Sequence, residues 1–459
     1  MNLQRNRFLA TVTLILVFTF LFVSLPINSS QAWSKKDSAT TVLLAEQPLS
    51  EYKSRRQKLM EKTKDGIVVV MGEEEDDLGV DAKFRQNDNF MYLSGIEVPT
   101  GILVLVPEGY QGAKEWLFLP TPNKFLDQWT GPRPSITEET AQAFGVEKVA
   151  SLNDFQKVIS EILTSEAFQK SGEKLYTVIP PSTYTKLIRE EKFVEQVRKI
   201  KSTVNLNPIA PLLADLRMVK SEPEITMIQR AIDITALAQS EVLKTVKPGI
   251  FEYELEGAIL GQFYRNGAQR AAFPCIVGSG ANATILHYEK NRKKIDSGDL
   301  IVVDIGAEYN YYAADITRTY PANGRFTPRQ REIYQLVLDA QSAAAKAFKP
   351  GQSTMHDLDS VARQTMRQSL LKDSKGNSLD QYFPHGLGHF LGMYVHDVGD
   401  YSRPLPVGAV ITIEPGIYLP DEKIGVRIED DYLVTKTGLV KLSENIPSDL
   451  EKIEKLMSK

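Results

Sequence analysis

Cysteine is almost absent from this sequence: Cys275 is the single one among 459 residues. No intrachain disulfide can form, so packing must stabilise the fold even in an oxidising compartment. Cys275 lies in an apolar stretch, residues 273–277, and its sequence neighbours offer no general base. These surroundings predict a buried, unreactive thiol and not a nucleophile.

An excess of positive charge is also lacking. The 54 Lys and Arg residues against 58 Asp and Glu give a formal net charge of -4, and 42% of the residues are hydrophobic. This is the composition of an ordinary globular protein without a basic stripe, which argues against nucleic acid as a partner. The length allows two or three domains with full cores, and we expect two.

A long uncharged apolar run occurs at the N-terminus, at residues 8–25, and follows Arg5 and Arg7. Small residues in Ser30-Gln31-Ala32 suit a signal peptidase, so residues 1–32 are predicted to be an export signal. We therefore expect the protein to be exported, either to the periplasm or out of the cell. The run is also at the lower edge of the length that spans a bilayer, so a membrane anchor stays an alternative.

A first domain is predicted from about residue 47 to residue 206. Short strand-like runs alternate there with helix-like segments and turn signals, which is typical of a small α/β domain. The clearest elements are expected at Ile67–Met71, Gly101–Val106, Glu115–Leu119, Glu138–Phe144 and Asn153–Leu163.

A second domain is predicted over residues 221–445. The segment Ser221–Glu224 has the pattern of a helix N-terminus: a serine cap, a proline in the first turn and a glutamate three residues after the cap. The long helix expected after it ends at Lys247–Gly249. The same design recurs between Thr327 and Gly351.

These two predicted helices end in matching sequences at a constant offset of 102 residues. Residues 238–249 and 340–351 share seven identities in a twelve-residue window. Two unrelated helix caps could share the Pro-Gly end, but not easily the rest, so we interpret the match as an internal duplication. Two related halves would place a site at their seam, with ligands from both.

Four carboxylates stand in or beside strand-like runs of the second domain. Asp304 interrupts an apolar run that would bury most of its side chains, and a buried charge needs a partner or a metal. Asp315 begins a second run, and Glu414 ends a third. Around Glu429 the sequence alternates, which places Arg427 and Glu429 on one face and the apolar side chains on the core face.

Histidines gather in the same domain, since four of the five lie within 110 residues: His287, His385, His389 and His396. The glycines between His385 and His389 argue against a helix there, and for a backbone that lies close to another part of the chain. We therefore expect one imidazole to join the four carboxylates.

Four neighbouring carboxylates would repel one another and raise one another's pKa values unless positive charge neutralises them. Two divalent cations would suffice. Oxygen ligands with one nitrogen suit Mn²⁺, Co²⁺, Fe²⁺ or Zn²⁺, and two such ions about 3.5 Å apart can share a hydroxide for hydrolysis. Each residue alone also has a structural explanation, such as a turn cap or a pair between Glu429 and Arg427. The joint pattern is what indicates a hydrolytic site.

Six motifs resemble, in order and spacing, the pita-bread metallopeptidases, and most of all Xaa-Pro aminopeptidase (aminopeptidase P) and prolidase. They are Ile285–Tyr288, Val303–Gly306, Ala314–Arg318, His385–His389, Ile413–Gly416 and Arg427–Asp430. Phe84–Asn87 and Trp129–Arg133 are similar, more weakly, to the creatinase-like N-terminal domain of that family. The resemblance implies an α/β (α+β) fold, with this smaller domain preceding a pita-bread domain that has an internal pseudo-two-fold duplication.

The resemblance also implies a role for each motif residue. The metal ligands would be Asp304, Asp315, His389, Glu414 and Glu429. Asp315 and Glu429 would bridge two ions, and Mn²⁺ is the metal that we expect. Glu414 would also take the proton of the bridging water, and His287 and His396 would stabilise the tetrahedral intermediate. The substrate pocket would be shaped by His385, Tyr418 and Arg427.

The expected activity is hydrolysis of the N-terminal Xaa-Pro bond of peptides with proline in the second position, a preference that rests on the resemblance alone. A dipeptidase confined to Xaa-Pro dipeptides is the nearest alternative. An exported binding protein that keeps a metal for stability is the alternative of another class. The resemblance further implies a homo-oligomer.

Overall fold

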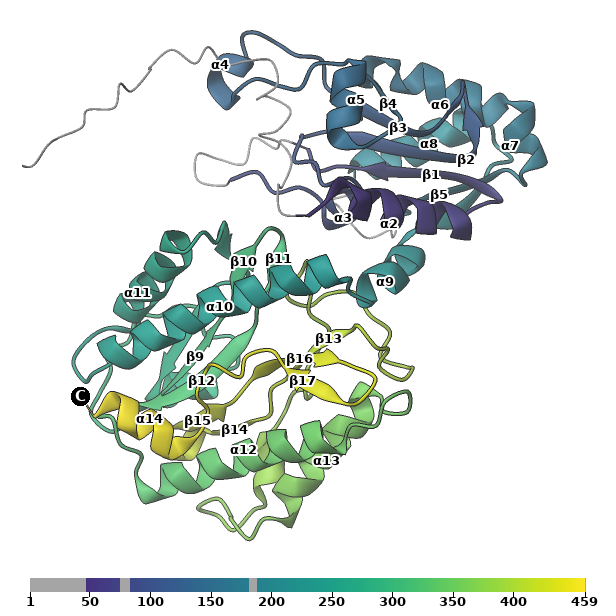
Figure 1. The fold of residues 1–459 in the computed structure, drawn as a ribbon. Coiled ribbons are helices and arrows are strands. Elements are labelled where there is room, and N and C mark those ends of the chain that lie inside the picture. The colour runs from purple at the N-terminus through teal and green to yellow at the C-terminus, as the bar shows by residue number, and fades with distance from the viewer. Residues whose placement is uncertain (1–46, 75–82, 181–187, 459) are drawn as a thin grey trace, which may run out of the picture.

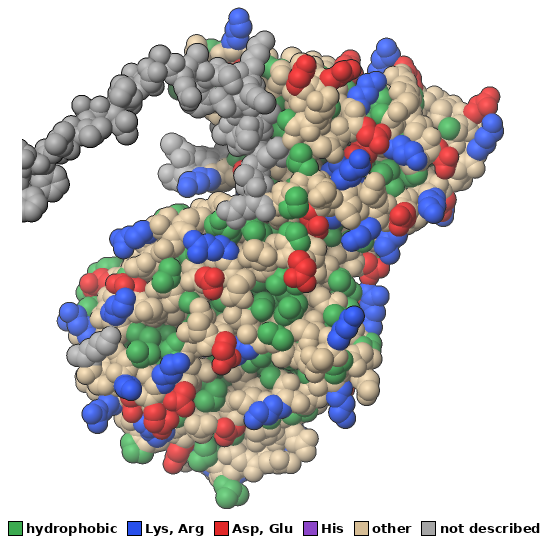
Figure 2. All heavy atoms as spheres, in the orientation of Figure 1, with side chains coloured by type: hydrophobic (Ala, Val, Ile, Leu, Met, Phe, Trp, Pro, Cys, Tyr) green, Lys and Arg blue, Asp and Glu red, His purple; other side chains and the backbone are tan. Residues whose placement is uncertain are grey.

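The computed structural model describes residues 47–74, 83–180 and 188–458. The predicted export segment, residues 1–32, and the apolar run 8–25 within it lie outside these ranges. Among the described residues, every helix is too short or too polar to cross a membrane. Figure 2 shows acidic and basic side chains intermixed over the visible face.

A mixed sheet with the strand order β4-β3-β2-β1-β5-β6 forms the centre of the N-terminal domain (Figure 1). Its strands are β1 (Gly66–Met71), β2 (Ile102–Tyr110), β3 (Ala113–Leu119), β4 (Lys148–Ser151), β5 (Lys174–Thr177) and β6 (Asn205–Pro208). β2 pairs antiparallel with β1 and β3, and the other neighbours pair parallel. The three strands expected from the sequence are confirmed as β1, β2 and β3.

Helices cover both faces of this sheet because its strands are apolar on both sides. Val68 and Val70 of β1 pack into one core with α2, α3 and α5, whereas Ile67 and Val69 pack into another with α6 and α8. The helices are α2 (Leu49–Lys62), α3 (Asp88–Ser94), α4 (Asp127–Thr130), α5 (Glu138–Phe144), α6 (Phe155–Thr164), α7 (Glu166–Lys170) and α8 (Ile188–Ile200). The two predicted helices are confirmed as α5 and α6.

The second domain consists of two halves that follow α9 (Ala210–Met218). The first half contains α10 (Glu222–Thr245), α11 (Glu252–Arg265), β7 (Arg270–Ala271), β8 (Ile276–Ser279), β9 (Leu300–Ile305), β10 (Ala307–Tyr309), β11 (Tyr312–Ala313) and β12 (Ile316–Pro321). The second contains α12 (Pro328–Ala347), α13 (Met355–Gln368), β13 (Val410–Ile413), β14 (Gly416–Leu419), β15 (Ile424–Arg427), β16 (Asp430–Val434), β17 (Leu439–Lys441) and α14 (Leu450–Met457). The predicted helices are confirmed as α10 and α12, and each begins at a capping box.

The duplication is visible in two equivalent glutamines, one on α10 and one on α12. Each donates from Nε2 to two backbone carbonyls, Gln239 to Val303 and Ile316 at 3.3 and 3.1 Å, and Gln341 to Ile413 and Ile428 at 2.9 and 3.2 Å. Each acceptor residue is the sequence neighbour of one of the four expected carboxylate ligands. Each long helix therefore holds the two carboxylate-bearing segments of its own half.

The second domain continues beyond the predicted end at residue 445. Leu450 and Ile453 of α14 are 2% and 0% exposed and belong to the main core of the domain. The sequence prediction stopped early because the last recognised motif ends near residue 430, and a short helix with two apolar anchors carries little periodicity of its own.

Cys275 is buried in the same core. Burial raises the pKa of its thiol to about 12, so the thiolate does not form at neutral pH. The prediction of an unreactive structural cysteine is therefore confirmed.

Candidate active site

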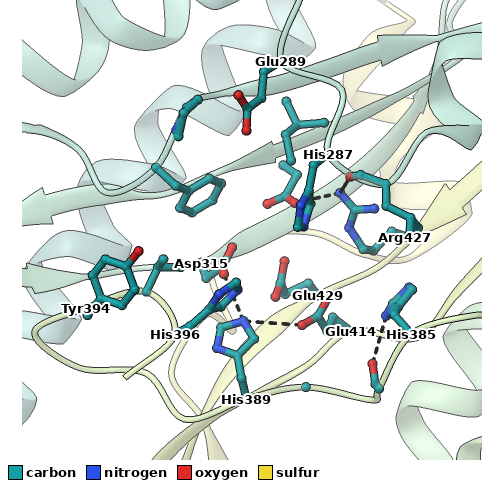
Figure 3. Close-up of a pocket in the computed structure, with 18 residues that line it drawn as sticks. His287, Glu289, Asp315, His385, His389, Tyr394, His396, Glu414, Arg427 and Glu429 are labelled. Carbon is teal, nitrogen blue, oxygen red and sulfur yellow. Dashed lines mark hydrogen bonds and ion pairs between the residues drawn. The ribbon is translucent and has the colours of Figure 1, made fainter. Parts of the chain in front are cut away.

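A cavity of about 430 Å³ receives side chains from both halves of the second domain (Figure 3). Phe273, Ile276 and Leu286 form an apolar part of its lining, which also includes Glu289. The predicted site residues on the lining are His287, Asp304, Asp315, His385, His389, His396, Glu414, Arg427 and Glu429. Tyr418 is not on the lining and instead contacts two residues that are.

Short strands bring the carboxylates of this cavity together from distant parts of the sequence. Asp304 on β9 stands opposite Thr317 on β12, and Asp315 directly precedes β12. Glu414 directly follows β13, and Glu429 lies between β15 and β16. Because these four carboxylates lie within or directly beside strands, the hydrogen bonds between the strands hold their positions.

Gly388 allows His389 to approach the strand β13 closely. A Cβ atom at position 388 would lie 2.1 Å from the backbone oxygen of Thr412. The backbone N–H of His389 donates to Thr412 Oγ1 at 3.0 Å, which fixes the position of the His389 backbone beside β13. The expected close approach of the backbone in the glycine-rich motif is therefore confirmed.

The ligand atoms of Asp315, His389 and Glu429 all lie within 4.8 Å of one another, a spacing at which one metal ion can contact them all. His389 Nε2 is 3.3 Å from Asp315 Oδ2 and 3.4 Å from Glu414 Oε1. Asp304 Oδ1 and Asp315 Oδ1 are buried without a hydrogen-bond partner among the described residues. Buried, unpaired carboxylate oxygens fit a cation well, because without one they lose solvation and gain nothing in return.

Burial and mutual repulsion raise the pKa values of three of these carboxyls. The pKa of Asp315 lies well above its usual range, first because of burial and then because of Asp304 and Glu414. The pKa of Glu429 is raised in the same way, by burial and then by Asp315. Burial raises the pKa of Glu414 to about 7. Such a cluster needs either protons or metal cations.

Metal-free protein should therefore lose stability as the pH rises above about 6.5. Folded Asp315, Glu414 and Glu429 hold protons more tightly than the unfolded chain does, so their stabilising contribution disappears as the pH passes their folded pKa, about 7 for Glu414. The pKa of His385 is lowered, so its opposite contribution is complete above about pH 6.5. We expect the Tm of chelated protein to fall from about pH 6.5 to about pH 8.5, and excess Mn²⁺ to remove most of the fall. A Tm that rises over this range without metal would contradict the cluster.

A chain of hydrogen bonds connects Asp304, through Arg427 and Tyr418, to His385. Arg427 Nη2 donates to Asp304 Oδ2 at 2.7 Å, and Nη1 donates to the Tyr418 hydroxyl at 2.9 Å. The Tyr418 oxygen lies 2.8 Å from His385 Nε2. Burial, followed by the charge of Arg427, lowers the pKa of His385 to about 4. His385 is therefore neutral at physiological pH, and the chain orients Asp304 while leaving its other oxygen free.

His287 and His396 present their rings to the open part of the cavity (Figure 3). The ring centroids of His396 and His389 are 4.4 Å apart, at an interplanar angle of 75°. Burial, followed by the neighbouring His389 and His287, lowers the pKa of His396. Both rings remain accessible to a molecule in the cavity, unlike the buried Tyr418.

Two threonines that the sequence analysis missed support the carboxylates. Thr317 Oγ1 donates to Glu429 Oε2 at 2.7 Å, and Thr412 Oγ1 donates to Glu414 Oε1 at 3.4 Å. Thr317 stands two residues after Asp315, and Thr412 two residues before Glu414. In extended chain this spacing puts both side chains on the ligand face, which is the signal that could have revealed them.

Comparison with known proteins shows which family this chain resembles. Residues 226–436 match metallopeptidase family M24, and residues 52–169 match the aminopeptidase P N-terminal domain. The Xaa-Pro aminopeptidase of Haemophilus influenzae is 35% identical over 442 residues, covering 90% of this chain and 99% of that protein. The chain belongs to the Xaa-Pro aminopeptidases of family M24.

One further relative and one solved structure are similar to this M24 metallopeptidase over most of its length. The Xaa-Pro aminopeptidase 3 of Homo sapiens is 34% identical over 442 residues, covering 89% of this chain and 86% of that protein. The solved structure of Escherichia coli aminopeptidase P with the inhibitor Pro-Leu has a TM-score of 0.80 at 32% identity, covering 90% and 99% of the two chains. The expected combination of a creatinase-like domain and a pita-bread domain is therefore confirmed, as is the enzyme class.

Proposed function

We propose that this enzyme hydrolyses the N-terminal Xaa-Pro bond of peptides, using two divalent cations held by the carboxylate cluster. The observation that carries the proposal is the convergence of Asp315, His389 and Glu429 within 4.8 Å in a cavity that receives both halves of an M24 domain. The preference for proline rests on the Xaa-Pro aminopeptidases that this chain resembles.

Five residues would hold the two cations: Asp304, Asp315, His389, Glu414 and Glu429. Four carboxylates and one imidazole form a donor set that suits Mn²⁺, and no thiolate is present that would favour a structural zinc site. Asp315 and Glu429 would both stand at the centre of this donor set, since their ligand atoms lie within 4.8 Å of each other and Asp315 raises the pKa of Glu429. When bound, two such cations supply a hydroxide nucleophile at neutral pH and withdraw charge from the attacked carbonyl.

The chain's own residues then carry the proton and orient the substrate. Glu414 accepts the proton of the attacking water, because its carboxylate lies at the cluster and its Oε1 is 3.4 Å from His389. His287 and His396 face the cavity and donate hydrogen bonds to the oxygen on which negative charge develops. Arg427 keeps Asp304 in place through its 2.7 Å contact.

The deciding experiment measures amino acids released from three small peptides by purified, Mn²⁺-loaded protein. We expect chelator-sensitive release of Arg from Arg-Pro-Pro, restored by added Mn²⁺, and far slower release from Arg-Ala-Pro, which lacks proline in the second position. Cleavage of Gly-Pro alone would instead identify a prolidase. No metal-dependent cleavage of any of the three would refute the proposal.

Export and self-association are separate parts of the proposal. Export rests on the pattern of residues 1–32, in which the uncharged run 8–25 follows two arginines. Association into a homo-oligomer rests on the family resemblance. Neither affects the chemistry of the cavity.

A further inference from the structure

The cavity wall that carries His396 is an irregular loop, Phe390–Asp397, which we call the His396 loop. Tyr394, Val395 and His396 of this loop line the cavity. The loop contains no helix and no strand, and two of its backbone hydrogen bonds are internal, from Gly392 N to Tyr394 O and from Asp397 N to Phe390 O. Its position must therefore depend on contacts with the rest of the molecule.

Asp397, next to His396 in the sequence, is held by two buried cations. Arg217 Nη2 on α9 lies 2.5 Å from Asp397 Oδ1, with the two side chains 5% and 1% exposed. Lys220 Nζ lies 3.5 Å from Asp397 Oδ2 and is 1% exposed. Arg217 also donates from Nη1 to Asn89 Oδ1 in the N-terminal domain, at 2.8 Å. One arginine thus joins that domain to the residue beside His396.

Arg85, from the N-terminal motif Phe84–Asn87, holds the same loop near its middle. Its Nη2 donates to the backbone oxygen of Met393 at 2.9 Å. Its Nη1 pairs with Asp88 at 2.6 Å, and its Nε pairs with Glu308 at 3.2 Å. Asp88 Oδ2 also lies 3.6 Å from Arg217 Nη2, so Asp88 pairs with both arginines. We call this set of alternating charges the clamp; its members are Glu308, Arg85, Asp88, Arg217, Asp397 and Lys220.

We propose that the clamp is the means by which the N-terminal domain positions His396, with Arg217 and Arg85 as positioning residues for the reaction. The inference rests on the role given to His396 in the proposed function. Asp397 is packed so tightly that a Cβ on Gly392 would lie 2.1 Å from its Oδ2, so the carboxylate cannot shift without moving the loop. Loss of Arg217 would leave the buried Asp397 with only the more distant Lys220 at 3.5 Å, and the loop would move to solvate the carboxylate. A displacement of about 1 Å in a catalytic group can cost on the order of 100-fold in rate.

The chain contains a matched control for interdomain ion pairing as such. Arg55 on α2 and Glu224 on α10 are also buried, each 2% exposed, and their charged atoms are 3.5 Å apart. This pair joins the same two domains, but neither residue lines the cavity and neither has a contact with the His396 loop among the described residues. A purely stabilising role would make the two arginines equivalent.

The experiment compares Arg217→Met with Arg55→Met in the full chain, loaded with Mn²⁺. We expect both variants to have a lower Tm and unchanged metal content. Arg217→Met should lower kcat for Arg-Pro-Pro by about 10-fold or more, whereas Arg55→Met should stay within about 2-fold. Arg217→Lys should recover part of the loss because it restores a cation opposite Asp397. Equal kcat losses in the two methionine variants, or none in Arg217→Met, would overturn the inference.

Hydrogen exchange of the loop amides is a readout that does not depend on activity. We expect faster exchange over residues 390–397 in Arg217→Met and not in Arg55→Met. Unchanged exchange would overturn the positioning role. Faster exchange with unaltered kcat would also overturn the inference, because the loop would then move without any effect on the reaction. Should Arg217→Met fail to fold, Arg85→Met applies the same test, because Arg85 is 20% exposed and reaches the loop through Met393 O.

Discussion

Asp315→Asn should reduce metal-dependent hydrolysis of Arg-Pro-Pro below detection while the protein stays folded. The substitution keeps the shape of the side chain but removes one negative charge from the cluster. Asp315 Oδ1 accepts no hydrogen bond from any described residue. If Asp315 bridges two cations as proposed, the loss of its charge weakens the binding of both. Turnover, together with metal content measured on the purified variant, tests the expectation.

The folded state of this variant gives an independent check. Since burial and neighbouring carboxylates hold the pKa of Asp315 well above its usual range, metal-free wild type must on folding either protonate Asp315 or bury a repelled charge, and the Asn variant avoids this cost. Its metal-free Tm at about pH 8 should therefore be higher than that of metal-free wild type. Asp339→Asn, on the exposed side of α12, is the control and should change neither property. Full turnover in Asp315→Asn would exclude Asp315 as a ligand.

Much of the second domain was predictable because its local signals agree with its global fold. The caps at Ser221 and Thr327 mark α10 and α12 correctly, and the repeat at residues 238–249 reflects the equivalent positions of Gln239 and Gln341. Apolar strands that carry a single acid are rare enough to mark ligand positions. The sequence could not reveal what Gln239 and Gln341 bind, because a glutamine on a helix has no preferred acceptor.

The support around the site was less predictable than the ligands themselves. Arg85 and Met393 are 308 positions apart, and Arg217 and Asp397 are 180 apart, so no local pattern relates them. The motif Phe84–Asn87 could be identified only by resemblance, which gave it no physical role. In the structure, its arginine contacts the His396 loop. Long-range contacts between charged side chains depend on how two domains meet, which periodicity and capping do not describe.

His396→Ala should lower kcat for Arg-Pro-Pro by about 100-fold to 1,000-fold, the usual effect of removing one donor to a developing oxyanion. The metal content should stay at the wild-type level, because the ligand atoms that cluster belong to Asp315, His389 and Glu429 and not to His396. KM should change little, since the lost hydrogen bond forms mainly in the transition state. Steady-state kinetics combined with metal analysis separates these effects.

The control is His356→Ala, because His356 is the one histidine that does not line the cavity, and it lies exposed on α13. That variant should behave as wild type in kcat, KM and metal content. A parallel loss of metal in His396→Ala would mean that His396 is a ligand or holds one, and would move its role from the substrate to the cluster. A loss confined to kcat would identify the His396 loop as the catalytic wall of the cavity.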